Sequence, residues 1–321
     1  MALFDLPLEQ LREYQPDRTE PDDFDIFWQD TLDAARGHEL SVRFQPYDAG
    51  LTAQDVYDVT FPGFGGHPIK AWMLIPKHRS GPVPCVLEYI GYGGGRGFPT
   101  GYTLISSAGY AHFIMDTRGQ GSVWQPGHTA DPGATGEPQF PGFLTRGLSS
   151  PSEHYYRRVF TDAVRAVEAA RSHPDIDGRI VVSGGSQGGG ISLAVAGLVD
   201  DLSAVWADQP FLSHYQHATR ITDAAPYSEI ARFLAQHPDK VEQAFATLSY
   251  VDVMNFAPRA NAPAHFSVGL MDAVCPPSTI YAAYNHYTAD KEMTVYEFNG
   301  HDSGGSHGVR EKILWLRKHL G

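Results

Sequence analysis

The sequence GGSQG at 184–188 most strongly constrains how this chain folds, because it joins two segments of different character. The run RIVVSGG at 179–185 is short, apolar and rich in β-branched residues, which is typical of a buried strand. The run GGGISLAVAGL at 188–198 consists of small residues, which is typical of a helix packed tightly on a sheet. A strand, a sharp turn and a helix in this order predict an α/β fold with Ser186 at the turn.

Short apolar runs alternate with helical patterns along most of the chain. Further strands are predicted at 56–61, 69–75, 85–90, 112–116, 204–210, 264–270 and 294–298. Helical periodicity is found at 156–167, 277–287 and 309–320. Because strands that alternate with helices form parallel sheets covered on both sides, we predict a mostly parallel central sheet with helices on both faces.

Three segments interrupt this alternation. Residues 1–40 carry apolar side chains at helical spacing after Pro21 and are predicted to form an N-terminal helical extension. Residues 121–153 are rich in Gly, Pro and Ser, and a loop of this length is usually functional or packed against a partner. Residues 211–260 follow the sixth predicted strand and are expected to form a helical insertion over the strand ends. The whole chain, 1–321, is expected to form one domain.

The composition excludes several classes of protein. The chain has 24 Lys and Arg residues against 37 Asp and Glu residues, which gives a formal net charge of −13. This acidic balance argues against a nucleic-acid-binding protein, because phosphate contacts require clustered basic residues. Hydrophobic residues make up 42% of the chain, enough for a large core and too many for a disordered protein.

The cysteine count and the N-terminal sequence indicate a compartment. Cys85 and Cys275 are the only cysteines and form no CxxC pair, so a disulfide scaffold and a zinc ribbon are excluded, while one long-range disulfide stays open. The N-terminal sequence lacks the basic region and apolar run of a secretory signal. No apolar stretch approaches the roughly 18 residues that a membrane span needs. We therefore expect a reduced, cytoplasmic protein with no membrane contact.

Ser186 is the candidate nucleophile. The pattern G-x-S-x-G between a strand and a helix is the nucleophile elbow of hydrolases. The turn presents the serine hydroxyl at the N-terminus of the next helix, where negative charge that develops during acyl transfer is stabilised. The alternative is a tight glycine turn with an incidental serine, and the strand–helix context favours the nucleophile.

A candidate acid and a candidate base follow in the chain order Ser, acid, His of α/β-hydrolases. Asp272 comes directly after the strand at 264–270, and Asp208 at the end of an earlier strand is the rival acid. His301 lies in the loop before the last helix, and His307 near the start of that helix is the rival base. The sequence holds no HExxH motif and no Cys/His pair at ligand spacing, so neither a metal nor another cofactor is expected.

A second glycine cluster, GYGGGRG at 91–97, comes directly after the strand at 85–90. It matches neither the Walker pattern nor GxGxxG, which argues against a phosphate-binding loop. At this place a hydrolase carries the loop that donates one oxyanion-hole N–H, and the backbone N–H of Gln187 would be the other donor. The alternative is a flexible glycine loop without a function.

Six motifs along the chain together resemble one family. They are GYGGGRGFP, MDTRGQGS, YYRRVFTDAVRA, GGSQGGG, SVGLMDAVCPPST and GHDSGG. In this order they resemble the acetyl xylan esterase/cephalosporin C deacetylase family, which is carbohydrate esterase family seven. The resemblance runs from the opening FDLPLEQL through the final helix, so it covers essentially the whole chain.

The resemblance implies an α/β-hydrolase fold with Ser186, Asp272 and His301 as the catalytic triad. It further implies Tyr92 and Gln187 as the backbone oxyanion donors, and a homohexamer built as a trimer of dimers. The implied activity is removal of acetyl groups from acetylated xylo-oligosaccharides and related small esters, including cephalosporin C. One departure is visible: the family usually has His-Glu where this chain has His301 followed by an aspartate, so the role of Asp302 stays open.

The position of three residues suggests an acyl pocket. Tyr92 lies in the predicted oxyanion loop, and Pro210 and Phe211 follow the strand at 204–210. We expect these three side chains to form the walls of a pocket that fits an acetyl group. Two other functions stay open: a peptidase of related fold, and a non-catalytic binding protein on a hydrolase scaffold.

Overall fold

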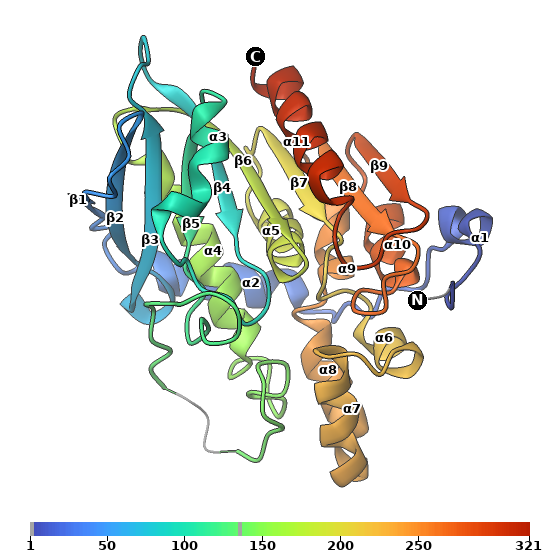
Figure 1. Ribbon diagram of the computed structural model, residues 1–321. Helices are drawn as coiled ribbons and strands as arrows, with labels where there is room; N and C mark the ends of the chain where they lie inside the picture. The colour runs from blue at the N-terminus through green and yellow to red at the C-terminus, as the bar shows by residue number, and fades with distance from the viewer. Residues whose placement is uncertain (1–2, 134–136) are drawn as a thin grey trace.

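A computed structural model describes residues 3–133 and 137–321, and its centre is a nine-stranded sheet in the order β1-β2-β3-β5-β4-β6-β7-β8-β9 (Figure 1). Residues 1–2 of the expected N-terminal extension and 134–136 of the expected long loop lie outside the described residues. The strands are β1 (Arg43–Pro46), β2 (Gln54–Pro62), β3 (Pro68–Pro76), β4 (Val83–Tyr89), β5 (Ala111–Met115), β6 (Ile176–Gly185), β7 (Ala204–Asp208), β8 (Ala264–Gly269) and β9 (Lys291–Tyr296).

The sheet is antiparallel at one edge and parallel elsewhere. β1, β2, β3 and β5 pair antiparallel in that order. From β5 onward, through β4, β6, β7, β8 and β9, every pairing is parallel. The prediction of a mostly parallel sheet is confirmed. The edge strand β1 was not predicted, because its sequence RFQP is mostly exposed and carries no apolar pattern.

Helices cover both faces of the sheet. The α-helices are α1 (Leu8–Glu13), α2 (Phe24–Arg36), α3 (Thr103–Ser107), α4 (Tyr155–Arg171), α5 (Gln187–Leu198), α6 (Tyr215–Ile221), α7 (Tyr227–Gln236), α8 (Val241–Ser249), α9 (Val253–Phe256), α10 (Pro277–His286) and α11 (Gly305–Leu320). Short 3₁₀ helices are η1 (Phe64–Gly66), η2 (Pro99–Tyr102), η3 (Pro238–Lys240) and η4 (Ala257–Arg259). None of the helices in the described ranges combines the length and apolar character needed to cross a bilayer.

The period of two along each strand divides the core between the two faces. In β4, Cys85 and Leu87 belong to the large cluster that contains α4 and α5 side chains. Val86, between them, packs in a second cluster with Trp315 of α11 and Ile105 of α3. In Figure 1, α3 and α11 accordingly lie in front of the sheet, and α4 and α5 lie behind it. The predicted α/β-hydrolase architecture is confirmed.

The two predicted helical additions are present. α1 and α2 form the N-terminal extension, and α2 begins at Phe24, shortly after Pro21. The helices α6 to α9 follow β7, and α6, α7 and α8 lie below the carboxyl ends of the parallel strands in Figure 1. Trp28 of α2 donates its indole N–H to the carbonyl of Tyr250 at 2.9 Å, which joins the extension to the insertion.

The long segment between β5 and α4 is anchored by buried ion pairs. Arg118 donates to both carboxylate oxygens of Asp162 in α4, at 2.5 and 2.6 Å, and both side chains are at most 1% exposed. Asp162 also accepts the backbone N–H of Phe64 at 2.8 Å. Asp131, further along the segment, pairs with Arg158 of α4 at 2.8 Å. These ion pairs bind the irregular segment to α4 through Arg118 and Asp131.

Replacement of Asp162 by alanine should lower the free energy of unfolding by about 3–5 kcal/mol, because it leaves the buried Arg118 without its main partner. Urea unfolding followed by circular dichroism measures this change. Asp30→Ala on the exposed face of α2 is the control and should change stability little. An Asp162 variant as stable as the Asp30 variant would contradict the assignment of a structural ion pair.

Candidate active site

The turn between β6 and α5 holds Ser186 in a strained conformation. Its φ and ψ are 55° and −118°, a region that residues with a side chain rarely adopt. A Cβ atom at Gly184 would lie 2.5 Å from the backbone of Gly188, and a Cβ atom at Gly188 would lie 2.0 Å from the carbonyl oxygen of Tyr89. Only glycine fits at either position, so the G-x-S-x-G pattern follows from the close approach of helix and sheet.

Asp272 and His301 form a hydrogen-bonded pair. The Nδ1 atom of His301 lies 2.7 Å from Oδ2 of Asp272, and the Asp272 side chain is completely buried. The second carboxylate oxygen, Oδ1, accepts the backbone N–H groups of Val274 at 2.8 Å and Cys275 at 2.9 Å. These two donors fix the carboxylate so that Oδ2 faces the imidazole.

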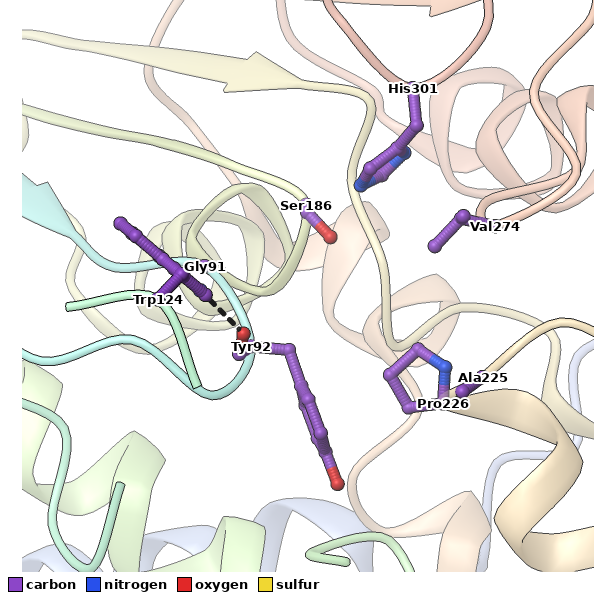
Figure 2. A pocket seen from close by; sticks show the side chains of 8 residues that line it. All are labelled: Gly91, Tyr92, Trp124, Ser186, Ala225, Pro226, Val274 and His301. Atoms are coloured by element: carbon purple, nitrogen blue, oxygen red, sulfur yellow. Dashed lines mark hydrogen bonds between the residues drawn. The ribbon is translucent and has the colours of Figure 1, made fainter. Parts of the chain in front are cut away.

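Ser186 and His301 line one cavity of about 370 Å³ (Figure 2). Its walls are formed by Gly91, Tyr92, Trp124, Ser186, Ala225, Pro226, Val274 and His301. The imidazole of His301 points toward Ser186 in Figure 2, and no hydrogen bond joins the two side chains within the described residues. Catalytic hydrogen bonds commonly form fully only when substrate binds. The lack of a direct hydrogen bond here is therefore compatible with a serine–histidine pair.

The rival residues lie elsewhere. Asp208 accepts hydrogen bonds from the indole of Trp206 at 2.7 Å and the hydroxyl of Ser267 at 2.8 Å, and it is not among the residues that line the cavity. His307 is exposed in the first turn of α11 and does not line the cavity either. The geometry therefore favours Asp272 and His301 over both rivals.

Gln209 holds the loop that carries His301. Its side-chain N–H₂ donates to the carbonyl of Gly300 at 2.5 Å, and its Oε1 accepts the backbone N–H of Ser303 at 2.8 Å. The buried Gln209 side chain thus contacts the backbone on both sides of His301. No sequence motif pointed to Gln209, whose position directly after β7 is the one local signal of a role near the site.

Asp302, whose role the sequence left open, is not among the residues that line the cavity. Its Oδ2 accepts the side-chain N–H₂ of Asn299 at 3.1 Å, and its backbone carbonyl accepts the N–H of Gly305 at 2.8 Å. Both bonds lie within the turn that follows β9. Asp302 therefore supports the local turn beside His301.

The predicted oxyanion donors lie on adjacent elements. Gln187 is the first residue of α5, so its N–H has no partner within the helix. No acceptor for the N–H of Tyr92 is found in the described parts of the chain. Gln120 connects the two segments, since it accepts the N–H of Gly93 at 2.7 Å and donates to the Gln187 side chain at 2.8 Å. Gln120 lies within the motif MDTRGQGS, which by itself does not predict this bridging contact.

The cavity walls differ in part from the prediction. Tyr92 lines the cavity as expected, whereas Pro210 and Phe211 are buried and are not among the residues that line it. The chain turns back after β7, where the N–H of Phe211 donates to the carbonyl of Ser186 at 3.0 Å. The Phe211 ring packs edge to face against Tyr92, with ring centroids 6.2 Å apart. Pro226, from the start of α7, forms a wall in their place. Sequence proximity to β7 did not reveal that the insertion returns to the cavity.

Three side chains near the serine could also hold a metal ion. Ligand atoms of Asp272, Cys275 and His301 all lie within 4.8 Å of one another. Both oxygens of Asp272 already accept hydrogen bonds, however, and burial raises the pKa of the Cys275 thiol well above its ordinary value, which keeps it protonated. These contacts favour an acid–base pair, and the expected absence of a metal stays a prediction.

Cys85 and Cys275 are both free thiols, so the disulfide that the sequence left open is not formed.

Three comparisons relate the chain to known proteins. The family model described as acetyl xylan esterase (AXE1) matches residues 1–319. The acetyl esterase Axe7A of Xylanibacter ruminicola is 32% identical over 324 residues, which cover 95% of this chain and 69% of that protein. The solved acetyl xylan esterase from Paenibacillus sp. R4 is 36% identical with a TM-score of 0.92, and the match covers 98% of this chain and 100% of that one. Acetyl xylan esterase 1 from Thermoanaerobacterium sp. JW/SL YS485 is 33% identical with a TM-score of 0.89, and coverage is 98% and 99%.

Replacement of Gln209 by alanine should lower kcat roughly 100-fold, because the loop that carries His301 loses its support and a shift of about 1 Å can cost that much. KM should change little, because Gln209 does not line the cavity. Steady-state kinetics with p-nitrophenyl acetate measure both constants, and Gln29→Ala on the exposed surface of α2 is the matched control. An unchanged kcat would mean that the loop holds its position without Gln209.

The choice between the two histidines is tested by a pair of variants. His301→Ala should lower kcat by about 10⁴–10⁶-fold, as removal of a triad member does. His307→Ala should keep most of the activity, since the residue is exposed on α11. Circular dichroism checks that both variants are folded. Loss of activity in His307→Ala together with retention in His301→Ala would assign the base to His307.

Proposed function

The chain belongs to the acetyl xylan esterase family, and we propose that it is a serine esterase that removes acetyl groups through an acetyl-enzyme on Ser186. Family membership makes it a carboxylic ester hydrolase for acetyl esters. The observation that carries the proposed mechanism is the hydrogen bond between the buried Asp272 and His301, which lines the same cavity as Ser186.

In the first step His301 accepts the hydroxyl proton of Ser186 as the serine oxygen attacks the acetyl carbonyl carbon. The oxyanion that forms accepts hydrogen bonds from the backbone N–H groups of Tyr92 and Gln187. Loss of one such donor typically costs about 3–4 kcal/mol in the transition state. The carbon–oxygen bond to the alcohol then breaks, and His301 returns the proton to the departing alkoxide.

In the second step water replaces the alcohol. His301 accepts a proton from the water molecule as its oxygen attacks the acetyl carbonyl, and the proton then passes to the oxygen of Ser186 as acetate leaves. Asp272 holds the imidazole in the tautomer with a proton on Nδ1 and stabilises the imidazolium ion. The two backbone donors that hold the Asp272 carboxylate support this orientation.

The cavity fits a small acyl group on one side of Ser186 and leaves room for the alcohol part of the ester to extend toward solvent. Tyr92, Pro226 and Val274 line the same cavity as Ser186, and as its walls they would favour acetyl over longer acyl groups. Trp124 also lines the cavity, is 57% exposed and is held by a 2.9 Å hydrogen bond from its indole N–H to the carbonyl of Tyr92. A leaving alcohol that extends past this ring reaches solvent. We therefore include acetylated xylo-oligosaccharides and cephalosporin C among the proposed substrates.

The assembly and the location of the enzyme are part of the same proposal. A homohexamer, built as a trimer of dimers, is supported by the family resemblance of the motifs. A reduced cytoplasmic setting is supported by the two free, buried thiols of Cys85 and Cys275. Triad chemistry requires no metal and no cofactor, so none is proposed.

The proposal is tested by acetate release from a panel of acetylated xylo-oligosaccharides and cephalosporin C, and by cleavage of the peptide bonds of an N-acetylated peptide. We expect acetate release from the esters and little cleavage of the peptide. Ser186→Ala should lower kcat by about 10⁴–10⁶-fold and abolish labelling by a fluorophosphonate probe. Ser107→Ala, on the exposed surface of α3, is the matched control.

Two outcomes would overturn the proposal. Faster turnover of the peptide than of the esters would indicate a peptidase. No turnover of any substrate, with no labelling of Ser186 in the unaltered chain, would indicate a binding protein on a hydrolase scaffold.

A further inference from the structure

Glu229 is a buried acidic residue that the proposed mechanism does not use. It lies in the first turn of α7 and is 6% exposed. Its Oε1 accepts the phenol hydroxyl of Tyr92 at 2.5 Å, and its Oε2 accepts the backbone N–H of Leu144 at 3.1 Å. An acid buried to this degree is rarely found without a specific partner, and here the partner belongs to the candidate oxyanion loop.

The contact joins three segments that are distant in sequence. The phenol oxygen of Tyr92 accepts the backbone N–H of Phe143 at 2.6 Å while its hydroxyl donates to Glu229. The Tyr92 and Phe143 rings also pack edge to face, with centroids 5.3 Å apart. A Cβ atom at Gly142 would lie 2.1 Å from the carboxylate of Glu229, so the loop approaches the acid closely. Helix α7, the loop at 91–97 and the segment before α4 meet at this carboxylate.

The charges at the junction are consistent with a tyrosine that donates to a carboxylate. Burial raises the pKa of the Glu229 carboxyl, and the hydrogen bonds from Tyr92 and the backbone N–H groups of Leu144 and Phe143 only partly oppose that rise. Burial and the nearby Glu229 raise the pKa of the Tyr92 phenol above its ordinary value, so Tyr92 keeps its proton. Arg146 lies near enough to stabilise the negative charge.

The same junction connects two cavity walls. In Figure 2 the Tyr92 ring extends from its loop along the cavity, and its hydroxyl lies at the far end. Pro226 forms the wall across from it and comes three residues before Glu229 at the start of α7. The backbone N–H of Glu229 donates to the carbonyl of Pro226 at 3.0 Å, so the hydrogen bond from Tyr92 to Glu229 links the two walls through one turn of chain.

We propose that Glu229 is a positioning residue that sets acyl-length specificity by holding the Tyr92 ring at a fixed distance from Pro226. With the hydrogen bond intact the ring closes the cavity beyond an acetyl group. Without it the ring is free to turn away, which makes room for longer acyl chains. This inference rests on the proposed esterase function and adds to it the residue that selects the acyl group.

Four variants test the proposal: Tyr92→Phe, Glu229→Ala, Glu229→Gln and the double variant Tyr92→Phe/Glu229→Ala. The measurement is kcat/KM for p-nitrophenyl acetate and p-nitrophenyl butanoate, with the melting temperature of each variant. Tyr92→Phe and Glu229→Ala should each lower the acetate-to-butanoate ratio by about tenfold, the scale on which a pocket distinguishes one methylene group. Glu229→Gln keeps one hydrogen bond to the phenol, so its ratio should lie near that of the unaltered enzyme.

The double variant and a matched control separate positioning from general stability. If Glu229 acts through Tyr92, the double variant should have the ratio of Glu229→Ala alone, since the two residues form one unit. Tyr250→Phe is the control, because it removes a hydrogen bond of 2.5 Å from a tyrosine to Asp23 at a site outside the cavity. It should leave the ratio unchanged even if the melting temperature falls.

The outcomes distinguish this inference from the proposed function. An unchanged ratio in folded Tyr92→Phe, or equal changes in Tyr92→Phe and Tyr250→Phe, would overturn the role of Glu229 while the esterase function stands. Additive effects in the double variant would also overturn it. An unaltered enzyme that hydrolyses neither ester would instead contradict the proposed function. Tyr92→Phe changes only one hydroxyl group, so the test does not depend on the folding of the Glu229 variants.

Discussion

The close contact between the first turn of α5 and the end of β4 is the constraint on which the candidate site depends. At Gly188 the helix backbone lies so near the Tyr89 carbonyl that no side chain fits between them. Ser186, two residues earlier in the elbow, is consequently held at a φ of 55°, a conformation that costs about 1–3 kcal/mol. Backbone hydrogen bonds to the chain around the end of β7, at 2.8 and 3.0 Å, hold the serine there. The same contact brings the loop after β4 beside the start of α5, where both candidate oxyanion donors lie.

Three polar side chains then fix the loops around this elbow. Gln120 joins the oxyanion loop to α5, Gln209 supports the turn that carries His301, and Glu229 holds the ring of Tyr92. Each contacts segments far from it in sequence, and each bonds at least one backbone N–H. A buried hydrogen bond contributes only about 0.5–1.5 kcal/mol net, whereas a buried partner left unpaired costs about 1–3 kcal/mol. We infer that these contacts select one arrangement of the loops more than they add to stability.

The accuracy of the sequence-based predictions follows the strength of the local pattern. β4, β6 and β8 are short apolar runs, and their existence and parallel order were predicted because buried strands require such runs. The edge strand β1 has no apolar pattern and exists because it pairs with β2, so it was missed. The helix α3 was also missed, because its five residues are too few to display a helical period. Pro210 and Phe211 were placed at the cavity from their position after β7, but the chain turns back there and buries them.

The sequence by itself determined the succession of strand, turn and helix that forms the elbow, the identity of Ser186 as the candidate nucleophile and the chain order of Asp272 and His301 behind it. These features depend on local backbone requirements, such as glycine at a close approach, and leave a local pattern. Only the tertiary structure decided that Asp272, and not Asp208, contacts His301. It also decided that Pro226 of the insertion lines the cavity, that Glu229 accepts the hydroxyl of Tyr92 and that Gln209 supports the histidine loop. The reason is physical: such contacts join segments about 30 to 140 residues apart in the sequence, and they arise from packing, which leaves no periodicity in the sequence.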